Sequence, residues 1–231
     1  MYNNYSDQVH YARESNLMYR VYAWMCAALA VTATSAYFIA STPSLMVFIH
    51  QNPFVLFFLF IVQLALVSVI SFLIHRINFA TTVALFLGYA FTLGITFSAI
   101  FIVFDMPSIF ATFLVTSGMF AAMAAYGYFT RADLSSMGSF LFMGLIGLIL
   151  CGLVNMFLRS ESFDYVISGI GVLIFTLFTA YDVQRIKRVM EEALGDRQTM
   201  AKVTILGALS LYLDFVNLFL SLLRFMGRRK D

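Results

Sequence analysis

The sequence VTILGALSLYLDFVNLFLSLLR, residues 203–224, decides the fold of this chain. A helix of about 20 apolar residues can cross a bilayer, and this stretch reaches that length. Asp214 stands near its middle, and small or polar residues repeat around it every three or four positions, at Thr204, Gly207, Ser210, Asn217 and Ser221. That spacing places them on one face of a helix. Because a carboxylate facing lipid is costly, we expect this face to turn toward protein or water.

The composition indicates an integral membrane protein. Of the 231 residues, 61% are hydrophobic and only 11% are charged, and long uncharged gaps separate the charges, as between Arg20 and Arg76. A soluble core does not produce a series of such gaps. The net charge of +2 gives no indication of nucleic-acid binding, so the lipid bilayer is the expected partner. Cys26 and Cys151 lie inside apolar runs, which favours packing roles over a disulfide.

Seven apolar runs predict transmembrane helices. They cover about residues 17–40, 54–74, 82–104, 109–129, 140–158, 165–186 and 203–224. A polar leader, residues 1–16, is expected to be flexible or interfacial, a charged loop, KRVMEEALGDRQTMAK, precedes the last run, and a basic tail covers residues 228–231. The predicted fold class is an all-α integral membrane protein, with one seven-helix domain over residues 17–227 and the C-terminal helix central.

The distribution of Lys and Arg predicts the orientation in the membrane. With the N-terminus inside, the outer loops carry Arg159 alone, and the inner segments carry Arg13, Arg20, Arg76, Arg131, Arg185, Lys187, Arg188, Arg197 and Lys202. Seven full crossings place the basic tail outside, against this rule. A final helix split at Asp214 could instead re-enter and return the tail inside. We expect seven crossings.

Two acidic residues stand apart from the termini and the connections, Asp182 near the end of the sixth run and Asp214. Asp182 is either functional or a helix-end carboxylate balanced by Arg185 and Lys187. Asp214 is either functional, as ionisable residues inside a membrane usually are, or a packing group hydrogen-bonded to a neighbouring helix. Ser210 and Asn217, one turn away on the same face, are candidates to support it.

Several motifs resemble the transmembrane Bax inhibitor motif family, and its bacterial members in particular. The resemblance rests on AYDVQRIK (residues 180–187) and on ILGALSLYLDFVNLFLSLLRFMG (residues 205–227), which ends close to the C-terminus. YAFTLGITFSAIF (residues 89–101) and GMFAAMAAYGYFTRADLSSMGSFLF (residues 118–142) also match, so the resemblance covers essentially residues 17–227.

The resemblance implies seven helices with the last enclosed by the others, in the bacterial cytoplasmic (inner) membrane. It implies that Asp182 and Asp214 are paired aspartates that share a proton and sense pH. It also implies that Arg76 pairs with one of them and latches a closed state. Members of the family are described as pH-sensitive calcium leak channels and as suppressors of stress-induced cell death. One departure bears on permeation: where some members carry an acidic residue in the second helix, this chain has Gln63 and Ala65.

Paired carboxylates have the chemistry that this function needs. Two of them within hydrogen-bond reach in a poorly solvated site cannot both ionise cheaply, so the pair titrates as a unit. When deprotonated, Asp182 and Asp214 offer hard oxygen ligands to calcium, although calcium takes six to eight, so waters and carbonyls must complete a weak site. Weak binding suits conduction, because the ion must leave again. Calcium or protons are thus the expected permeant ions, and no cofactor is expected.

Two other classes of function are compatible with the sequence. One is a non-transporting regulator of the stress response, or of a membrane quality-control protease on which its helices would dock. The other is an intramembrane aspartyl protease, since a carboxylate dyad can activate water. That class has Gly-x-Gly-Asp at its second aspartate, whereas this chain has Leu211-Tyr212-Leu213-Asp214, and it lacks a Pro-Ala-Leu signature. We therefore expect no enzymatic activity.

Overall fold

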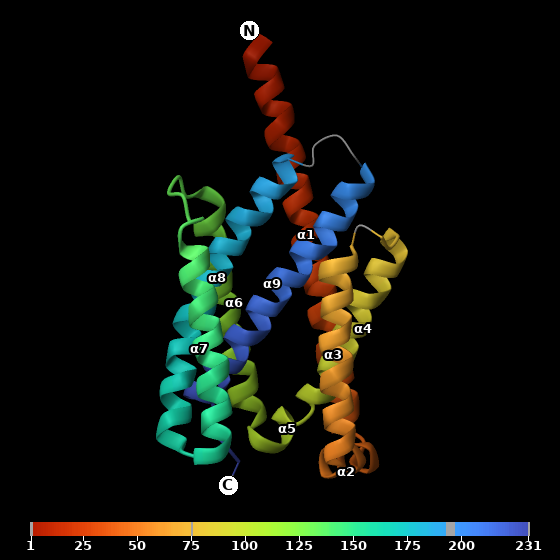
Figure 1. The fold of residues 1–231 in the computed structure, drawn as a ribbon, viewed down its shortest axis with the longest axis vertical. Coiled ribbons are helices and arrows are strands. Elements are labelled where there is room, and N and C mark those ends of the chain that lie inside the picture. Colours follow the sequence, from red (N-terminus) through yellow and green to blue (C-terminus); the bar gives the residue numbers. More distant parts are fainter. Residues whose placement is uncertain (1, 75, 193–196, 231) are drawn as a thin grey trace. The chain divides into compact units, whose positions relative to one another are not determined.

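The computed structural model describes the backbone of residues 2–74, 76–192 and 197–230, and the side chains of residues 17–74, 76–192 and 199–230. Within these ranges the chain forms helices joined by short connections (Figure 1). The helices are Tyr2–Ala40 (α1), Pro43–Gln51 (α2), Pro53–Leu73 (α3), Phe79–Phe97 (α4), Ile100–Val103 (α5), Met106–Phe129 (α6), Met137–Leu158 (α7), Glu161–Glu192 (α8) and Arg197–Met226 (α9). Seven helical stretches of the described chain are long and apolar enough to span a membrane, which confirms the prediction of an all-α integral membrane protein with seven transmembrane helices.

Three segments expected to be loops or leaders are helical. α1 continues back through the polar leader to Tyr2, and the connection before the second span forms α2, with Pro43 in its first turn, where proline is well tolerated. The charged loop is also largely helical, because α8 extends to Glu192 and α9 begins at Arg197. Its Lys, Arg, Glu and Met residues are good helix formers despite their polarity. Residues 193–196 lie outside the described residues.

The helices divide into two compact units, and the division falls inside α8 and inside α9. The first unit contains Met1–Val103 and Lys187–Tyr212, and the second contains Phe104–Ile186 and Leu213–Asp231. Each unit is described by itself below. The single domain over residues 17–227 stays a prediction.

In the first unit, α4 packs against both α1 and α3. Gly94 allows the close approach of α1, because a Cβ atom there would collide with the Ser35 hydroxyl and lie 2.5 Å from the Thr32 carbonyl oxygen. The Thr32 hydroxyl lies 2.9 Å from the Ala90 carbonyl oxygen and 2.6 Å from the hydroxyl of Tyr212 in α9. α1, α4 and the first part of α9 therefore meet at a buried polar contact.

In the second unit, α6 packs closely on α8. A Cβ atom on Gly127 would collide with the backbone of Ala180, so the two helices touch through their main chains. Phe215 of α9 makes edge-to-face contacts with Phe113 and Phe120 of α6, with ring centroids 5.7 and 5.5 Å apart. α6, α8 and the second part of α9 thus form the packed part of this unit.

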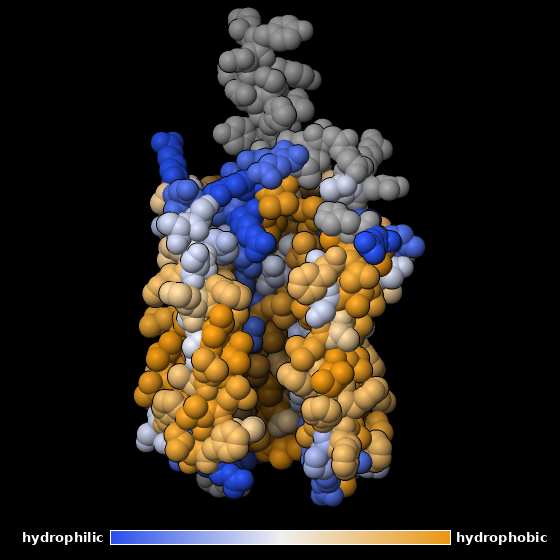
Figure 2. Space-filling model, in the orientation of Figure 1, coloured by the Kyte–Doolittle hydropathy of each residue, from blue (hydrophilic) through white to orange (hydrophobic). Residues whose placement is uncertain are grey.

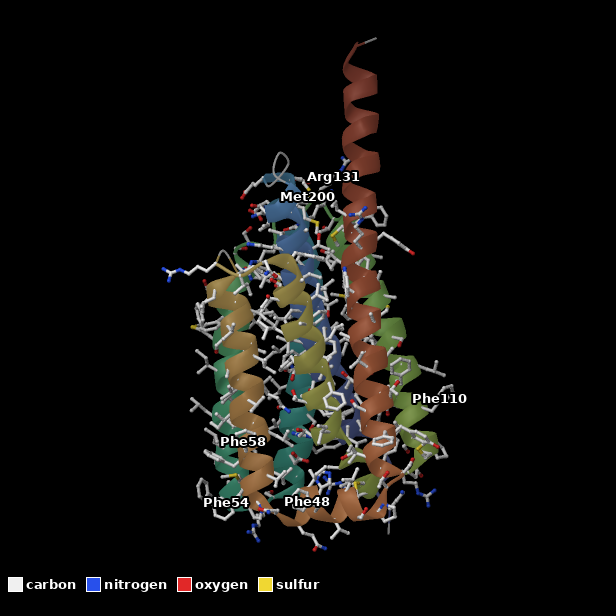
Figure 3. All side chains as sticks on the ribbon, turned by 90° about the vertical axis from the view of Figure 1, so that its right-hand side faces the viewer. Phe48, Phe54, Phe58, Phe110, Arg131 and Met200 are labelled. Atoms are coloured by element: carbon white, nitrogen blue, oxygen red, sulfur yellow. The ribbon has the colours of Figure 1, made fainter. Side chains whose placement is uncertain are left out.

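The outward surfaces are apolar. Figure 2 shows hydrophobic residues along the visible sides of the helices and polar residues gathered toward their ends. Phe54 and Phe58 of α3 and Phe110 of α6 project outward (Figure 3), and their exposed fractions run from 64% to 84%. Such surfaces suit contact with lipid, which carries no cost for apolar side chains.

α9 contains the most buried apolar stretch of the described spans, since 67% of its 18-residue apolar window is buried, against 6–44% in the others. It is one continuous helix from Arg197 to Met226, so it is not split at Asp214, and the re-entrant alternative loses its structural basis. At 30 residues it is about 45 Å long, more than the roughly 30 Å of a bilayer core. Burial reaches several of its faces, since Leu211 and Leu218 are as inaccessible as Thr204 and Asp214. Its enclosure by the other six spans stays a prediction.

Candidate functional site

The two aspartates singled out by the sequence belong to the same unit. Asp182 lies in α8, and Asp214 lies in the second part of α9. These stretches run antiparallel: beyond Asp214, Ser221 lies against Gly171, and Phe225 stacks on Tyr165 at a centroid distance of 4.3 Å. Residues further along α9 therefore contact residues nearer the start of α8.

The carboxyl groups of Asp182 and Asp214 lie close together. The Asp182 carboxyl group is within hydrogen-bond reach of the Asp214 carboxyl group, where a second negative charge would act on it. A carboxylate only accepts hydrogen bonds, so a bond between two carboxyl groups requires a proton on one of them. That the two share a proton stays a prediction.

Both aspartates are shielded from solvent. Asp182 is 8% exposed and Asp214 is 6% exposed, and their neighbours Val183, Phe215 and Val216 are buried and apolar. The Oδ2 atom of Asp214 is buried without a hydrogen-bond partner among the described residues. An unsatisfied buried carboxyl oxygen is costly, so this atom is the natural place for a proton, a water molecule or a cation.

Arg185 of α8 forms a long ion pair with Asp182. Nη1 of Arg185 lies 4.0 Å from Oδ1 of Asp182, the limit of an ion pair, and the Arg185 side chain is 63% exposed. A long, solvated pair of this kind contributes little. The balancing of Asp182 by Lys187 stays a prediction.

Gln184 anchors α8 near the pair, and the sequence analysis missed it. Its Nε2 donates to the Ala132 carbonyl oxygen at 2.8 Å, and its Oε1 accepts from the Leu134 N–H at 2.9 Å. Both partners lie in the loop between α6 and α7. The available signal is a glutamine two positions after Asp182, at the point where the apolar part of α8 ends. The carboxamide anchors this loop to α8, one turn from the Gly127–Ala180 contact.

Of the other predicted site residues, Asn217 belongs to the same unit as the pair, and Ser210 and Arg76 belong to the first unit. The Asn217 amide donates to the Leu213 carbonyl oxygen at 2.8 Å, so it binds its own helix rather than Asp214. Ser210 is half-buried and belongs to the first unit. Arg76 is exposed in the turn between α3 and α4, where its N–H donates to the Leu73 carbonyl oxygen at 2.8 Å. Because Arg76 and Asp182 belong to different units, their pairing stays a prediction.

Within the described part of the chain, the acid pair is not joined by a third metal-ligating side chain. Among the residues that the structure describes, three or more His, Cys, Asp or Glu side chains nowhere gather as a metal site. Gln63, which stands where an acidic residue was considered, donates to Oγ1 of Thr96 at 2.8 Å and to the Thr92 carbonyl oxygen at 3.1 Å. It thereby joins α3 to α4.

The helices and the buried acid pair define a multi-pass helical membrane protein with ionisable groups inside its spans. The family model described as "Inhibitor of apoptosis-promoting Bax1" matches residues 14–231. The chain belongs to this Bax inhibitor family, which confirms the resemblance noted in its sequence.

Relatives in bacteria extend over nearly the whole chain. "Inner membrane protein YbhL" of Escherichia coli (strain K12) is 46% identical over 214 residues, 92% of either chain. An "Uncharacterized protein" of Borreliella burgdorferi is 39% identical over 218 residues, 94% of either chain. "Uncharacterized protein RP147" of Rickettsia prowazekii is 40% identical over 215 residues, 93% of this chain and 90% of that protein. With the seven apolar spans, these similarities identify a multi-pass protein of the bacterial inner membrane.

Proposed function

We propose that this protein is a pH-sensitive calcium (cation) leak channel in which Asp182 and Asp214 form the proton sensor on the ion pathway. The observation that carries the proposal is the close approach of two buried carboxyl groups, together with the Oδ2 atom of Asp214, which has no hydrogen-bond partner among the described residues. Inside a membrane protein such a pair is expensive to keep, which favours a functional role over packing.

The proposed mechanism is a change of charge at the pair. With one proton shared, the pair holds a single negative charge and the two side chains stay joined. Loss of that proton creates two negative charges that repel each other and attract a cation. Calcium would then bind weakly through the carboxylates, with waters and backbone carbonyls completing its shell, and would leave again.

Calcium flux into liposomes that contain only this protein tests the proposal. Liposomes with the wild-type chain should take up calcium at a rate that changes with pH near neutrality. The Asp214→Asn variant, which keeps the size of the side chain but removes its charge, should lose that change. An empty-liposome control sets the background. A wild-type rate equal to that background would overturn the channel and favour the non-transporting regulator.

A further inference from the structure

The C-terminal residues 227–229, here called the C-terminal strap, fold back onto the end of the second unit that holds the starts of α6 and α8. The Arg228 N–H donates to the Ser108 hydroxyl at 3.0 Å, and the Asp105 N–H donates to the Arg228 carbonyl oxygen at 3.3 Å. Residue Arg229 forms an isolated antiparallel bridge with Phe104. The strap is thus bound through its main chain to the segment before α6.

Among the described residues, Arg229 makes the only ion pairs between the strap and α8. Its Nη2 lies 3.3 Å from Oδ2 of Asp164, and its Nη1 lies 3.6 Å from Oε1 of Glu161. Asp164 is the better shielded partner, since its side chain is 25% exposed against 89% for Glu161. One guanidinium therefore connects the C-terminus to the first turn of α8.

Between the strap and the acid pair, α9 contacts α8 through two glycines and one aromatic stack. α8 presents Gly171 to Ser221 and Gly169 to Phe225, and the Phe225 ring also stacks on Tyr165 at a centroid distance of 4.3 Å. The edge-to-face rings of Phe215 and Phe113 hold α9 against α6. The polar contacts at the two ends add to this packing in setting the position of α9 along α8.

The distance from Asp164 to Asp182 along α8 agrees with the distance from Asp214 to Arg229 along α9 and the strap. From Asp164 to Asp182, α8 covers 18 residues, about 27 Å at 1.5 Å per residue. From Asp214 to the end of α9 at Met226 the helix covers 12 residues, about 18 Å, and three extended residues add about 10 Å. Arg229 thus reaches Asp164 when Asp214 stands opposite Asp182. A slide by one helical turn, about 5.4 Å, would break one contact or the other.

We propose that the C-terminal strap, with Arg229 as its positioning residue, sets the register of α9 along α8 and so holds Asp214 opposite Asp182. Gly227 permits the turn into the strap, because a Cβ atom there would collide with the Leu223 carbonyl oxygen and lie 2.9 Å from a ring carbon of Phe104. The pairing also neutralises Arg229 with two acids, which eases the placement of a basic tail on the predicted outer side of the membrane. Only the consequence for calcium flux rests on the proposed function.

A cysteine pair reports the register without any reference to flux. An ideal Cβ atom on Gly171 lies 3.3 Å from Cβ of Ser221, close to the separation of roughly 3.5–4.5 Å in disulfides. In a background with Cys26 and Cys151 replaced by alanine, Gly171→Cys with Ser221→Cys should cross-link readily under mild oxidation. Protection from a maleimide-polymer label measures the rate, and each single cysteine variant controls for links between chains.

Arg229→Ala in this background should slow the cross-link about two- to fivefold, the range that exposed ion pairs contribute. Arg229→Lys should restore part of the rate, because it keeps a cation within reach of Asp164. Arg228→Ala is the matched control, since it removes a neighbouring arginine side chain and leaves the backbone bonds of the strap in place. Equal rates for wild type, Arg229→Ala and Arg228→Ala would overturn the register proposal.

Flux measured on the same variants with the native Gly171 and Ser221 separates this proposal from the proposed function. Arg229→Ala should move the pH midpoint of calcium flux toward acid, because separated carboxylates titrate independently. Arg228→Ala should leave the midpoint in place. A slower cross-link in Arg229→Ala together with a wild-type protein that carries no calcium would support the strap and overturn the channel.

Discussion

The carboxyl group of Asp214 in α9 lies within hydrogen-bond reach of that of Asp182 in α8, 32 positions earlier in the chain. Both side chains are less than 10% exposed, and the second oxygen of Asp214 has no hydrogen-bond partner among the described residues. The two helices that carry them are antiparallel neighbours in one compact unit. The packing of α8 against α9 therefore sets the distance between the two carboxyl groups. Substitutions that change this packing should change the interaction between the two aspartates.

Substitution of Gly127 should destabilise the packing of α6 on α8. Gly127→Ala places a methyl group against the backbone of Ala180, which cannot move as a side chain would. We expect a loss of about 1–3 kcal/mol in the free energy of unfolding, the cost of overpacking. Unfolding in mixed detergent micelles measures it.

Gly118→Ala on the same helix is the matched control, because a Cβ atom there meets nothing within 4 Å. It should leave stability unchanged or raise it by up to about 1 kcal/mol, the helix propensity of alanine over glycine. Equal effects of the two substitutions would contradict the close α6–α8 contact.

The buried hydroxyl of Tyr212 should contribute to the stability of the first unit. Tyr212→Phe keeps the ring, which contacts Phe86 and Tyr89, and removes the hydrogen bond to Thr32. We expect a loss of about 0.5–1.5 kcal/mol in the free energy of unfolding. Tyr37→Phe, at a tyrosine that is 61% exposed, serves as the control and should cost less. A Tyr212→Phe protein as stable as the wild type would show that this contact is dispensable.

Asp105 should stabilise the start of α6 in a pH-dependent way. Hydrogen bonds from the side chain and the backbone N–H of Ser108 hold the pKa of the Asp105 carboxyl group below its usual value of 3.8. Because the pKa is lower in the folded state, the contribution is present above the unfolded value and is lost as pH falls through the folded value. Asp105→Ala should lower the thermal midpoint at neutral pH.

The difference between wild type and Asp105→Ala should shrink as pH is lowered below 3.8. Asp105→Asn keeps a capping oxygen but no charge, so its deficit should be small and nearly independent of pH. Thermal midpoints of the three proteins over a series of acidic pH values check this. A constant gap between wild type and Asp105→Ala would contradict the ionised cap.

Arg76 should act as a latch if the pairing implied by the family resemblance exists. Arg76→Ala would then release a closed state and raise calcium leak at neutral pH by about fivefold or more, the effect of a coupling of at least roughly 1 kcal/mol. Arg131→Ala, which removes an exposed cation from the loop after α6, is the control. Identical flux profiles across near-neutral pH for wild type and Arg76→Ala would contradict the prediction that Arg76 acts as a latch.

The spans and the two candidate aspartates could be predicted because each depends on local sequence. A long run of apolar residues is costly in water whatever surrounds it. Residues 17–40 and 140–158 therefore each predict a transmembrane span without reference to the rest of the chain. Asp182 and Asp214 stood out because the other acidic residues lie at the ends or in connections. Their contact came from the family resemblance and not from spacing, since no periodicity relates residues on different helices.

The connections and the strap depend on contacts that the sequence does not display. Pro43 lies between two predicted spans, where the sequence predicts a connection, although proline is also common in the first turn of a helix such as α2. Gln184 and Arg229 act through partners about 50 and 65 positions away. No sequence pattern distinguishes a polar side chain that binds such a distant partner from one that is solvated.

The shared proton is tested most directly by calcium flux against pH in liposomes for wild type, Asp182→Asn, Asp214→Asn and the double variant. If the pair acts as one unit, either single substitution should abolish the near-neutral pH dependence, and the double variant should add little, because such residues are non-additive. Separate, additive effects of the two substitutions, or a wild type whose flux does not change with pH, would contradict the paired-carboxylate sensor.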